Sequence, residues 1–268
     1  MFTIYTLSDS SGETAELVAK SALSQFGLDK AALCRLPKIR SADQIKKLFL
    51  SLIKPPGIIV YTLVLPETRE ALVKEAEKYS VPLHDVMGEL VGKFENIFNS
   101  VPLQEPGLRL KINKAYFNRM EAIHYAIKYD DGQNINEINT ADIVLMGVSA
   151  TGKTPICMYL AQHYGLKSAN VPIVLGMDFP RKLFQINPQK IVGLICDPLV
   201  LQSFRTTRAN SPQMSYSPEY FDLSNIAKEI NAPGKIFREL NCEVIDMTNS
   251  PVQDIAVEII TKLQMVKR

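Results

Sequence analysis

The sequence predicts an α/β protein made of two α/β units with mostly parallel sheets. Short runs rich in β-branched and aromatic residues alternate along the chain with segments of helical periodicity. At about 150 residues per domain, the 268 residues correspond to one large domain or two modest ones. A stretch that bears proline and glycine, SVPLQEPGLRL at 100–110, interrupts the alternation. We therefore expect an N-terminal domain over 1–106 and a C-terminal domain over 107–268.

The first domain is expected to contain four strands, each followed by a helix. Its strands are predicted from short apolar runs at 2–7, 33–36, 57–65 and 81–83. Its helices are predicted from apolar residues three and four positions apart, at 15–26, 42–52, 67–78 and 83–98. A helix between consecutive strands is the usual crossover of a parallel sheet, which is why parallel pairing is expected.

The second domain begins with a long predicted helix at 113–129, which ends in the letters YDDG. Strand-like and helical segments alternate after it. The clearest strands lie at 142–147, 170–175, 190–196 and 242–247. This half therefore also predicts a mostly parallel sheet.

Charge and composition exclude several classes of function. The chain has 30 Lys+Arg and 28 Asp+Glu, so its net charge of +2 gives no basis for nucleic acid or an anionic membrane as main partner. The four cysteines lie far apart with no CxxC pair, which argues against zinc and fits buried thiols in a reducing compartment. The N-terminus is too polar for a signal peptide, and the apolar runs are too short to span a membrane. We expect a cytoplasmic protein.

Residues 147–154 read GVSATGKT and match the phosphate-binding loop (P-loop) pattern GxxxxGK[ST]. A predicted strand precedes the motif and a predicted helix follows it, as a P-loop requires. Glycines let the backbone point N–H groups at a polyphosphate, the lysine adds an ammonium, and the threonine adds a hydroxyl for Mg²⁺. The predicted nucleotide-binding residues are Gly147, Val148, Ser149, Ala150, Thr151, Gly152, Lys153 and Thr154. The alternative is a glycine turn with a solvated lysine.

Four aspartates are candidates for work beside this loop. Asp197 ends the run KIVGLICD, where a metal-linked carboxylate is expected together with Thr154, and Asp246 is its rival. Either could instead be a turn or helix-cap residue. Asp130 and Asp131 follow a helix C-terminus, where the dipole disfavours carboxylates, and such a conflict is typical of a general base or a metal ligand. The alternative for this pair is a solvated turn.

Two further groups of residues have both a functional and a structural interpretation. Arg205 and Arg208 follow the Asp197 segment and could reach a transferring phosphoryl group, although most such clusters are solvated. The loop SDSSG could bind phosphate or a phosphorylated target through its N–H groups. Its residues are Ser8, Asp9, Ser10, Ser11 and Gly12. Alternatively, Ser10 and Glu13 form a helix-capping box.

A series of motifs, in this order, resembles the pyruvate, phosphate dikinase regulatory proteins. The motifs are SDSSGETAE, HDVMGEL, YFNRMEAIHYAIKYDDG, GVSATGKTPICMYLA, ANVPIV and VIDMT. The likeness runs nearly end to end. A sister family acts on phosphoenolpyruvate synthase, and its N-terminal loop tends to differ from the one here.

The resemblance implies a bifunctional serine/threonine kinase and phosphorylase that acts on the dikinase as its protein partner. ADP would phosphorylate an active-site threonine of that enzyme, and inorganic phosphate would remove the group as pyrophosphate, with Mg²⁺ as the expected metal. By that likeness residues 147–154 bind ADP. The residues themselves fit this chemistry: Lys153 can reach the β-phosphate, and we expect Asp130 or Asp131 to be the base for the threonine hydroxyl. No eukaryotic-type HRD or DFG signature is present.

The loop departs from the family pattern at Ala150, where arginine is common, and Arg205 or Arg208 could substitute for it. Because of Ala150, a non-catalytic protein that binds ADP as a sensor stays open. A P-loop kinase of a small metabolite that uses ATP also stays open, since the same loop serves such enzymes. A third alternative is the same pair of activities on phosphoenolpyruvate synthase. Whether the chain pairs into a homodimer also stays open.

Overall fold

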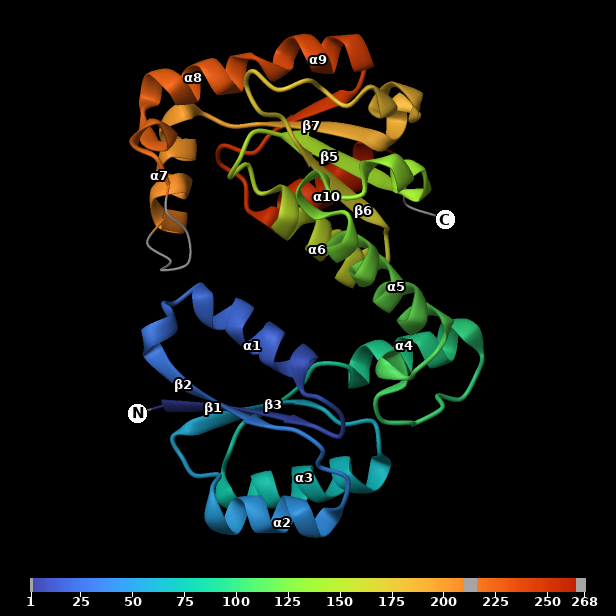
Figure 1. Cartoon of the computed structure of the whole chain (residues 1–268). Coiled ribbons are helices and arrows are strands. Elements are labelled where there is room, and N and C mark those ends of the chain that lie inside the picture. Colours follow the sequence, from blue (N-terminus) through green and yellow to red (C-terminus); the bar gives the residue numbers. More distant parts are fainter. Residues whose placement is uncertain (1, 210–215, 264–268) are drawn as a thin grey trace. The chain divides into compact units, whose positions relative to one another are not determined.

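The computed structural model describes residues 2–209 and 216–263 and divides into two compact units, Met1–Lys111 and Ile112–Arg268 (Figure 1). The predicted boundary lies a few residues before the observed one. Gly107 packs against the first unit so closely that an added Cβ would lie 2.9 Å from Ser10 Oγ. Leu108–Leu110 then forms a short 3-10 helix that also belongs to this unit.

The first unit is a four-stranded parallel sheet with the strand order β2-β1-β3-β4. Its strands are β1 Phe2–Ser8, β2 Ala31–Leu36, β3 Gly57–Thr62 and β4 Leu83–Asp85; its helices are α1 Glu13–Ser24, α2 Ala42–Ser51, α3 Pro66–Tyr79 and α4 Gly88–Phe98, with a 3-10 turn at Leu28–Lys30. Helix α1 covers one face of the sheet, and α2 and α3 cover the other (Figure 1). Successive residues of β3 accordingly enter different cores, Ile59 on the α2/α3 side and Val60 on the α1 side.

The second unit repeats this plan with the strand order β6-β5-β7-β8, again all parallel. Its strands are β5 Ile143–Gly147, β6 Ser168–Pro172, β7 Ile191–Ile195 and β8 Glu243–Asp246; its α-helices are α5 Lys114–Lys128, α6 Lys153–Tyr164, α7 Pro198–Ala209, α8 Leu223–Asn231, α9 Pro233–Leu240 and α10 Val252–Lys262. Short 3-10 helices lie at Asp130–Gly132, Ile135–Thr140, Arg181–Gln185, Pro188–Lys190 and Pro218–Phe221.

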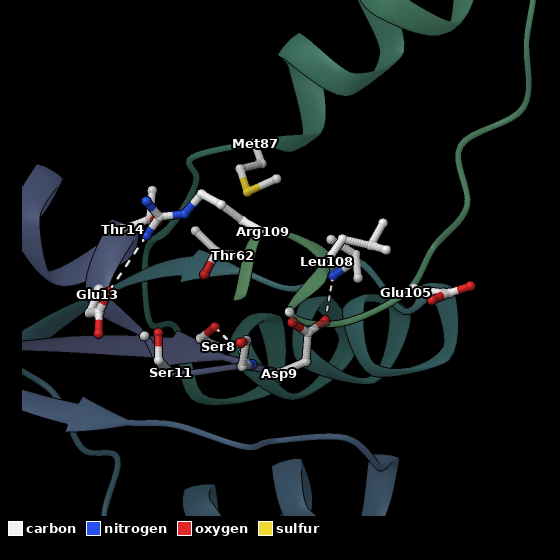
Figure 2. A pocket seen from close by; sticks show the side chains of 14 residues that line it. Ser8, Asp9, Ser11, Glu13, Thr14, Thr62, Met87, Glu105, Leu108 and Arg109 are labelled. Atoms are coloured by element: carbon white, nitrogen blue, oxygen red, sulfur yellow. Dashed lines mark hydrogen bonds and ion pairs between the residues drawn. The ribbon is translucent and has the colours of Figure 1, made fainter. Parts of the chain in front are cut away.

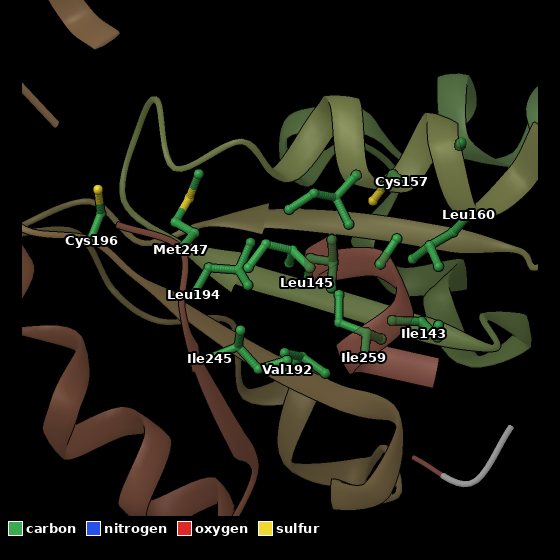
Figure 3. Packing of buried hydrophobic residues seen from close by; sticks show 14 of the residues in the cluster. Ile143, Leu145, Cys157, Leu160, Val192, Leu194, Cys196, Ile245, Met247 and Ile259 are labelled. Carbon is green, nitrogen blue, oxygen red and sulfur yellow. The ribbon is translucent and has the colours of Figure 1, made fainter. Parts of the chain in front are cut away.

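Strand β5 is buried along its whole length because both faces of its sheet are covered. Leu145 packs with Leu160 of α6 and Ile259 of α10 on one side (Figure 3). Met146 packs with Phe237 of α9 on the other. A central parallel strand therefore reads as a continuous apolar run, DIVLM, that ends where the P-loop begins.

Several predicted elements differ in their bounds: the strand predicted at 57–65 ends at Thr62, and the strand predicted at 170–175 forms at Ser168–Pro172. At 83–85 the type of element differs as well. The helix predicted at 83–98 begins only at Gly88, because Leu83–Asp85 instead pairs with β3 as an edge strand. Asp85 Oδ1 accepts the N–H groups of Met87 and Gly88 at 3.1 and 2.7 Å, which turns the chain into α4. The described part of the chain contains no helix with the length and apolar character of a membrane span.

The strand order gives each unit one switch point, where consecutive connections leave the sheet toward opposite edges. The chain leaves β1 toward one edge of its sheet and β3 toward the other, and β5 and β7 are related in the same way. In open parallel sheets ligands bind outside the carboxyl ends of the strands at such a switch point. The loops after β1 and β5 therefore occupy equivalent positions, and the second of them is the P-loop.

Candidate functional site

The P-loop joins β5 to α6 through a backbone that its sequence makes possible. A Cβ added to Gly147 would lie 2.8 Å from both Leu194 O and Thr151 Oγ1, so only glycine fits there. Gly152, at φ 70°, precedes the first turn of α6 and makes no side-chain cap. Ala150 also adopts a positive φ, 71°, which a side chain tolerates only at a cost. Thr151 Oγ1 donates to Val148 O at 2.8 Å and closes the loop from inside.

Lys153 is the buried cation of this site. Its residue is 6% exposed, and its Nζ donates to Val148 O at 2.9 Å. Burial lowers the pKa of Lys153 to about 8, while the nearby carboxylate of Asp131 opposes that shift and the charge of Arg208 adds to it. A desolvated ammonium of this kind binds anions more strongly than one in water. The alternative of a solvated lysine is therefore wrong.

Three side chains form a hydrogen-bonded network at the start of α6. Thr154 Oγ1 donates to Asp130 Oδ1 at 2.8 Å, and the Asn170 amide donates to both, to Thr154 Oγ1 at 3.2 Å and to Asp130 Oδ1 at a short distance. The carboxylate partner of the P-loop threonine is thus Asp130. The sequence reasoning missed Asn170, although an amide inside the buried strand SANVP was a signal that it holds another polar group.

Asp131 lies beside this network with its carboxylate exposed. Its backbone has a positive φ, 52°, and its N–H donates to Asn170 Oδ1 at 2.9 Å, which fixes the turn. Its side chain makes no hydrogen bond or ion pair with any residue that the structure describes. The two aspartates therefore differ: Asp130 is bonded to Thr154 of the loop, whereas the Asp131 carboxylate is exposed and accessible to a ligand.

Asp197 and Asp246 are bonded elsewhere. Asp197 Oδ1 accepts the N–H groups of Leu199 and Val200 at 2.8 and 3.3 Å and so caps α7. Asp246 Oδ1 accepts the N–H of Thr248 at 2.9 Å and forms a turn. The cap and turn interpretations thus describe both residues, and the metal role of Asp197 stays a prediction. Over 2–209 and 216–263, no three His, Cys, Asp or Glu side chains are grouped to hold a metal ion.

The two arginines of α7 lie in different environments, Arg205 in the interior and Arg208 at the surface. Arg205 is fully buried, and its guanidinium pairs with Glu229 at 2.6 Å, donates to Tyr220 O at 2.9 Å and to Ser149 O at 3.4 Å, and lies 4.3 Å from the Tyr220 ring. The expectation that Arg205 reaches a phosphoryl group is therefore wrong, because its buried guanidinium bonds the backbone carbonyl of the P-loop residue Ser149. Arg208 is exposed, and its charge is close enough to lower the pKa of Lys153. It is therefore the arginine that can substitute for the one that the family pattern commonly has at the position of Ala150.

The loop after β1 lines a cavity of about 400 Å³ in the first unit (Figure 2). All five predicted residues, 8–12, contribute to its wall. The predicted capping box is wrong: Gly12 precedes α1 with φ 82°, and no side chain caps the helix.

The four cysteines are free, and burial raises the pKa of Cys196 to about 11.

A parallel sheet with a lysine and a Thr–Asp pair in the loop at its switch point is typical of proteins that bind phosphate. The chain belongs to the kinase/pyrophosphorylase family, whose model matches residues 4–260, and this family supports the class of phosphotransferases. Similar relatives are provisionally named pyruvate, phosphate dikinase regulatory proteins. They include those of Bacillus subtilis (43% identical, covering 94% of each chain), Geobacter metallireducens (42%, 97% of each) and Carboxydothermus hydrogenoformans (39%, 96% of this chain and 92% of the relative).

Proposed function

We propose that the chain regulates pyruvate, phosphate dikinase by two opposed reactions. In one, the β-phosphoryl group of ADP passes to a threonine hydroxyl of the dikinase, which releases AMP and a proton. In the other, inorganic phosphate takes that group from the phosphothreonine, which returns the hydroxyl and yields pyrophosphate. The relatives' names and the family support the target and the two activities.

The observation that carries the proposal is that two adjacent carboxylates, those of Asp130 and Asp131, have different partners. Asp130 accepts the Thr154 hydroxyl at 2.8 Å, whereas Asp131 is exposed and faces the charge of Lys153. We assign Asp131 as the base that accepts the proton of the target threonine. In the opposite direction it returns that proton to the leaving oxygen.

The other residues of the site bind and align phosphate. The P-loop N–H groups and the buried Lys153 ammonium neutralise the transferred group, and Arg208 adds a second cation from α7. Mg²⁺ is held in many nucleotide sites by one or two protein oxygens together with phosphate, so Thr154 and Asp130 suit it. Bound there, the ion would neutralise phosphate charge.

The test is transfer from ADP labelled in its β-phosphate to the dikinase, supplied with a substrate that phosphorylates its catalytic histidine. We expect label on threonine, and we expect Asp131→Asn to lower the rate by about two orders of magnitude or more, as loss of a general base does. Asp43→Asn, an exposed change on α2 of the first unit, removes the same charge outside the P-loop domain and should leave the rate unchanged.

Three other outcomes would redirect the proposal. Transfer only to phosphoenolpyruvate synthase would exchange the target. Transfer of the ATP γ-phosphate to a free metabolite without any protein partner would make the chain a small-molecule kinase. Tight ADP binding without turnover on either protein would make it a sensor.

A further inference from the structure

The cavity after β1 is a candidate ligand site that the proposed reactions do not use. It lies at the carboxyl ends of β1 and β3, the switch point of the first sheet, just as the P-loop lies at that of the second. Each loop ends in a glycine with positive φ, Gly12 at 82° and Gly152 at 70°, and each leads into a 12-residue helix with no side-chain cap. Such helix starts have free N–H groups.

The loop's own hydrogen bonds leave its donors for a ligand. Every backbone carbonyl from 8 to 12 already accepts a hydrogen bond. The donors are Ile39 N to Ser8 O (2.9 Å), Arg40 Nε to Asp9 O (2.9 Å), Lys38 N to Ser10 O (3.0 Å), Arg35 Nε to Ser11 O (2.9 Å) and Glu16 N to Gly12 O (3.1 Å). By contrast, no acceptor within the described residues bonds the N–H groups of Ser11 and Gly12. The loop therefore presents donors, not acceptors.

Thr62 gives the independent indication of a ligand. It ends β3 directly beside Ser8 of β1 and is 6% exposed, yet its side chain lines the cavity (Figure 2). Its hydroxyl has no hydrogen-bond partner among the residues that the structure describes. Although the residue is buried, this hydroxyl is not sealed inside the protein; it is accessible from the cavity and can bond a group bound there. A bound oxyanion would supply the missing acceptor.

The charged side chains around the cavity leave room for an anion. Arg109 reaches over it and pairs with exposed Glu13 at 3.5 Å, a surface pair that exchanges readily (Figure 2). Three carboxylates line the cavity with Arg109: Glu13 pairs with that arginine, Glu105 pairs with Lys111, and one oxygen of Asp9, Oδ2, accepts Val64 N at 2.6 Å. Arg109 is thus the cation available to a ligand.

We propose that this cavity binds a phosphoryl oxyanion, either free phosphate or a phosphoryl group carried by an amino-acid side chain. The Ser11 and Gly12 N–H groups, the Thr62 hydroxyl and Arg109 would hold its oxygens. The residues of this site belong to the first unit and those of the P-loop to the second, and occupation of the cavity does not require the transfer reactions.

The test is calorimetric titration of the full chain with inorganic phosphate in a Lys153→Ala background, which weakens the P-loop site. We expect this variant still to bind phosphate. Adding Thr62→Val should weaken binding at least about tenfold, equivalent to about 1.4 kcal/mol. Thr62→Ser should restore it. Thr3→Val, the same change at the opposite end of the sheet, is the matched control and should have no effect.

Absence of phosphate binding in the Lys153→Ala chain would overturn the proposal, as would equal affinities of the Thr62→Val and Thr3→Val chains. If Thr62→Val does not fold, Arg109→Ala, an exposed change, takes its place with the same expected loss. A parallel titration with O-phosphothreonine identifies the source of the group. Tighter binding than inorganic phosphate supports a protein-borne phosphoryl group, and weaker binding supports free phosphate.

Discussion

Burial of the Lys153 ammonium couples its charge to ligand binding. With a pKa of about 8, the lysine is largely neutral at about pH 9 in the free protein, whereas bound phosphate favours its charged form. We therefore expect ADP binding at about pH 9 to take up a proton, and ADP affinity to fall as pH rises through about 8. Calorimetry in two buffers of different ionisation enthalpy measures the uptake. A heat independent of the buffer would contradict it, and Lys153→Met should show none.

The same lysine should destabilise the free protein. Its folded pKa lies below the ordinary value of 10.5, so the unfolded chain binds more protons between about pH 8 and 10.5 and the wild type gains stability over that window. We expect Lys153→Met to raise the free energy of unfolding at neutral pH by about 1–3 kcal/mol. The difference should shrink above pH 8. Urea unfolding at pH 7 and at about pH 10 measures it, and a constant difference would argue against the account.

The two adjacent aspartates should give different kinetic defects. Asp130 contacts the loop threonine, so we expect Asp130→Asn mainly to raise the KM for ADP. Among the described residues, the Asp131 side chain makes no hydrogen bond to the loop, so its asparagine variant should mainly lower kcat. Steady-state kinetics on the dikinase separates the two, and identical defects would remove the distinction.

Helix α7 carries two arginines one turn apart to which we assign different roles, Arg205 in stability and Arg208 in ADP binding. Arg205 is buried against Glu229 and the P-loop carbonyl of Ser149, so we expect Arg205→Ala to cost about 3–5 kcal/mol of stability. Arg208 is exposed on the same helix, and Arg208→Ala should change stability by less than about 0.5 kcal/mol while it weakens ADP binding. Urea unfolding and ADP titration of both variants test this. Equal stability losses would refute it.

Periodicity identified most elements of both sheets, because strands buried on two faces read as short apolar runs such as DIVLM and GIIVYT. It failed at 83–85, where the apolar spacing of LHDVMGEL suits a helix but the Asp85 carboxylate turns the chain into one only at Gly88. The strand, loop and helix around 147–154 could be predicted because the motif is local. The roles of Asn170 and Arg205 could not, since each depends on a partner brought near by the fold: Asp130 is 40 positions from Asn170, and Glu229 is 24 from Arg205.

Across the whole molecule, the two units share one topology and place a glycine-ended loop at the same point of each sheet. Alternation of strands and helices predicted the class of both units, but the strand order, and with it the equivalence of the two loops, appears only in the structure. That equivalence is what makes a second oxyanion site in the first unit a physical expectation.

If the chain regulates the dikinase as proposed, one phosphate loop serves both directions of phosphoryl exchange. The most direct measurement follows ADP labelled in its β-phosphate through a single sample. The label should first appear on dikinase threonine and then, after inorganic phosphate is added, in pyrophosphate, and Lys153→Ala should abolish both steps. Label that never reaches threonine, or a Lys153→Ala chain that loses one step and keeps the other, would contradict the account.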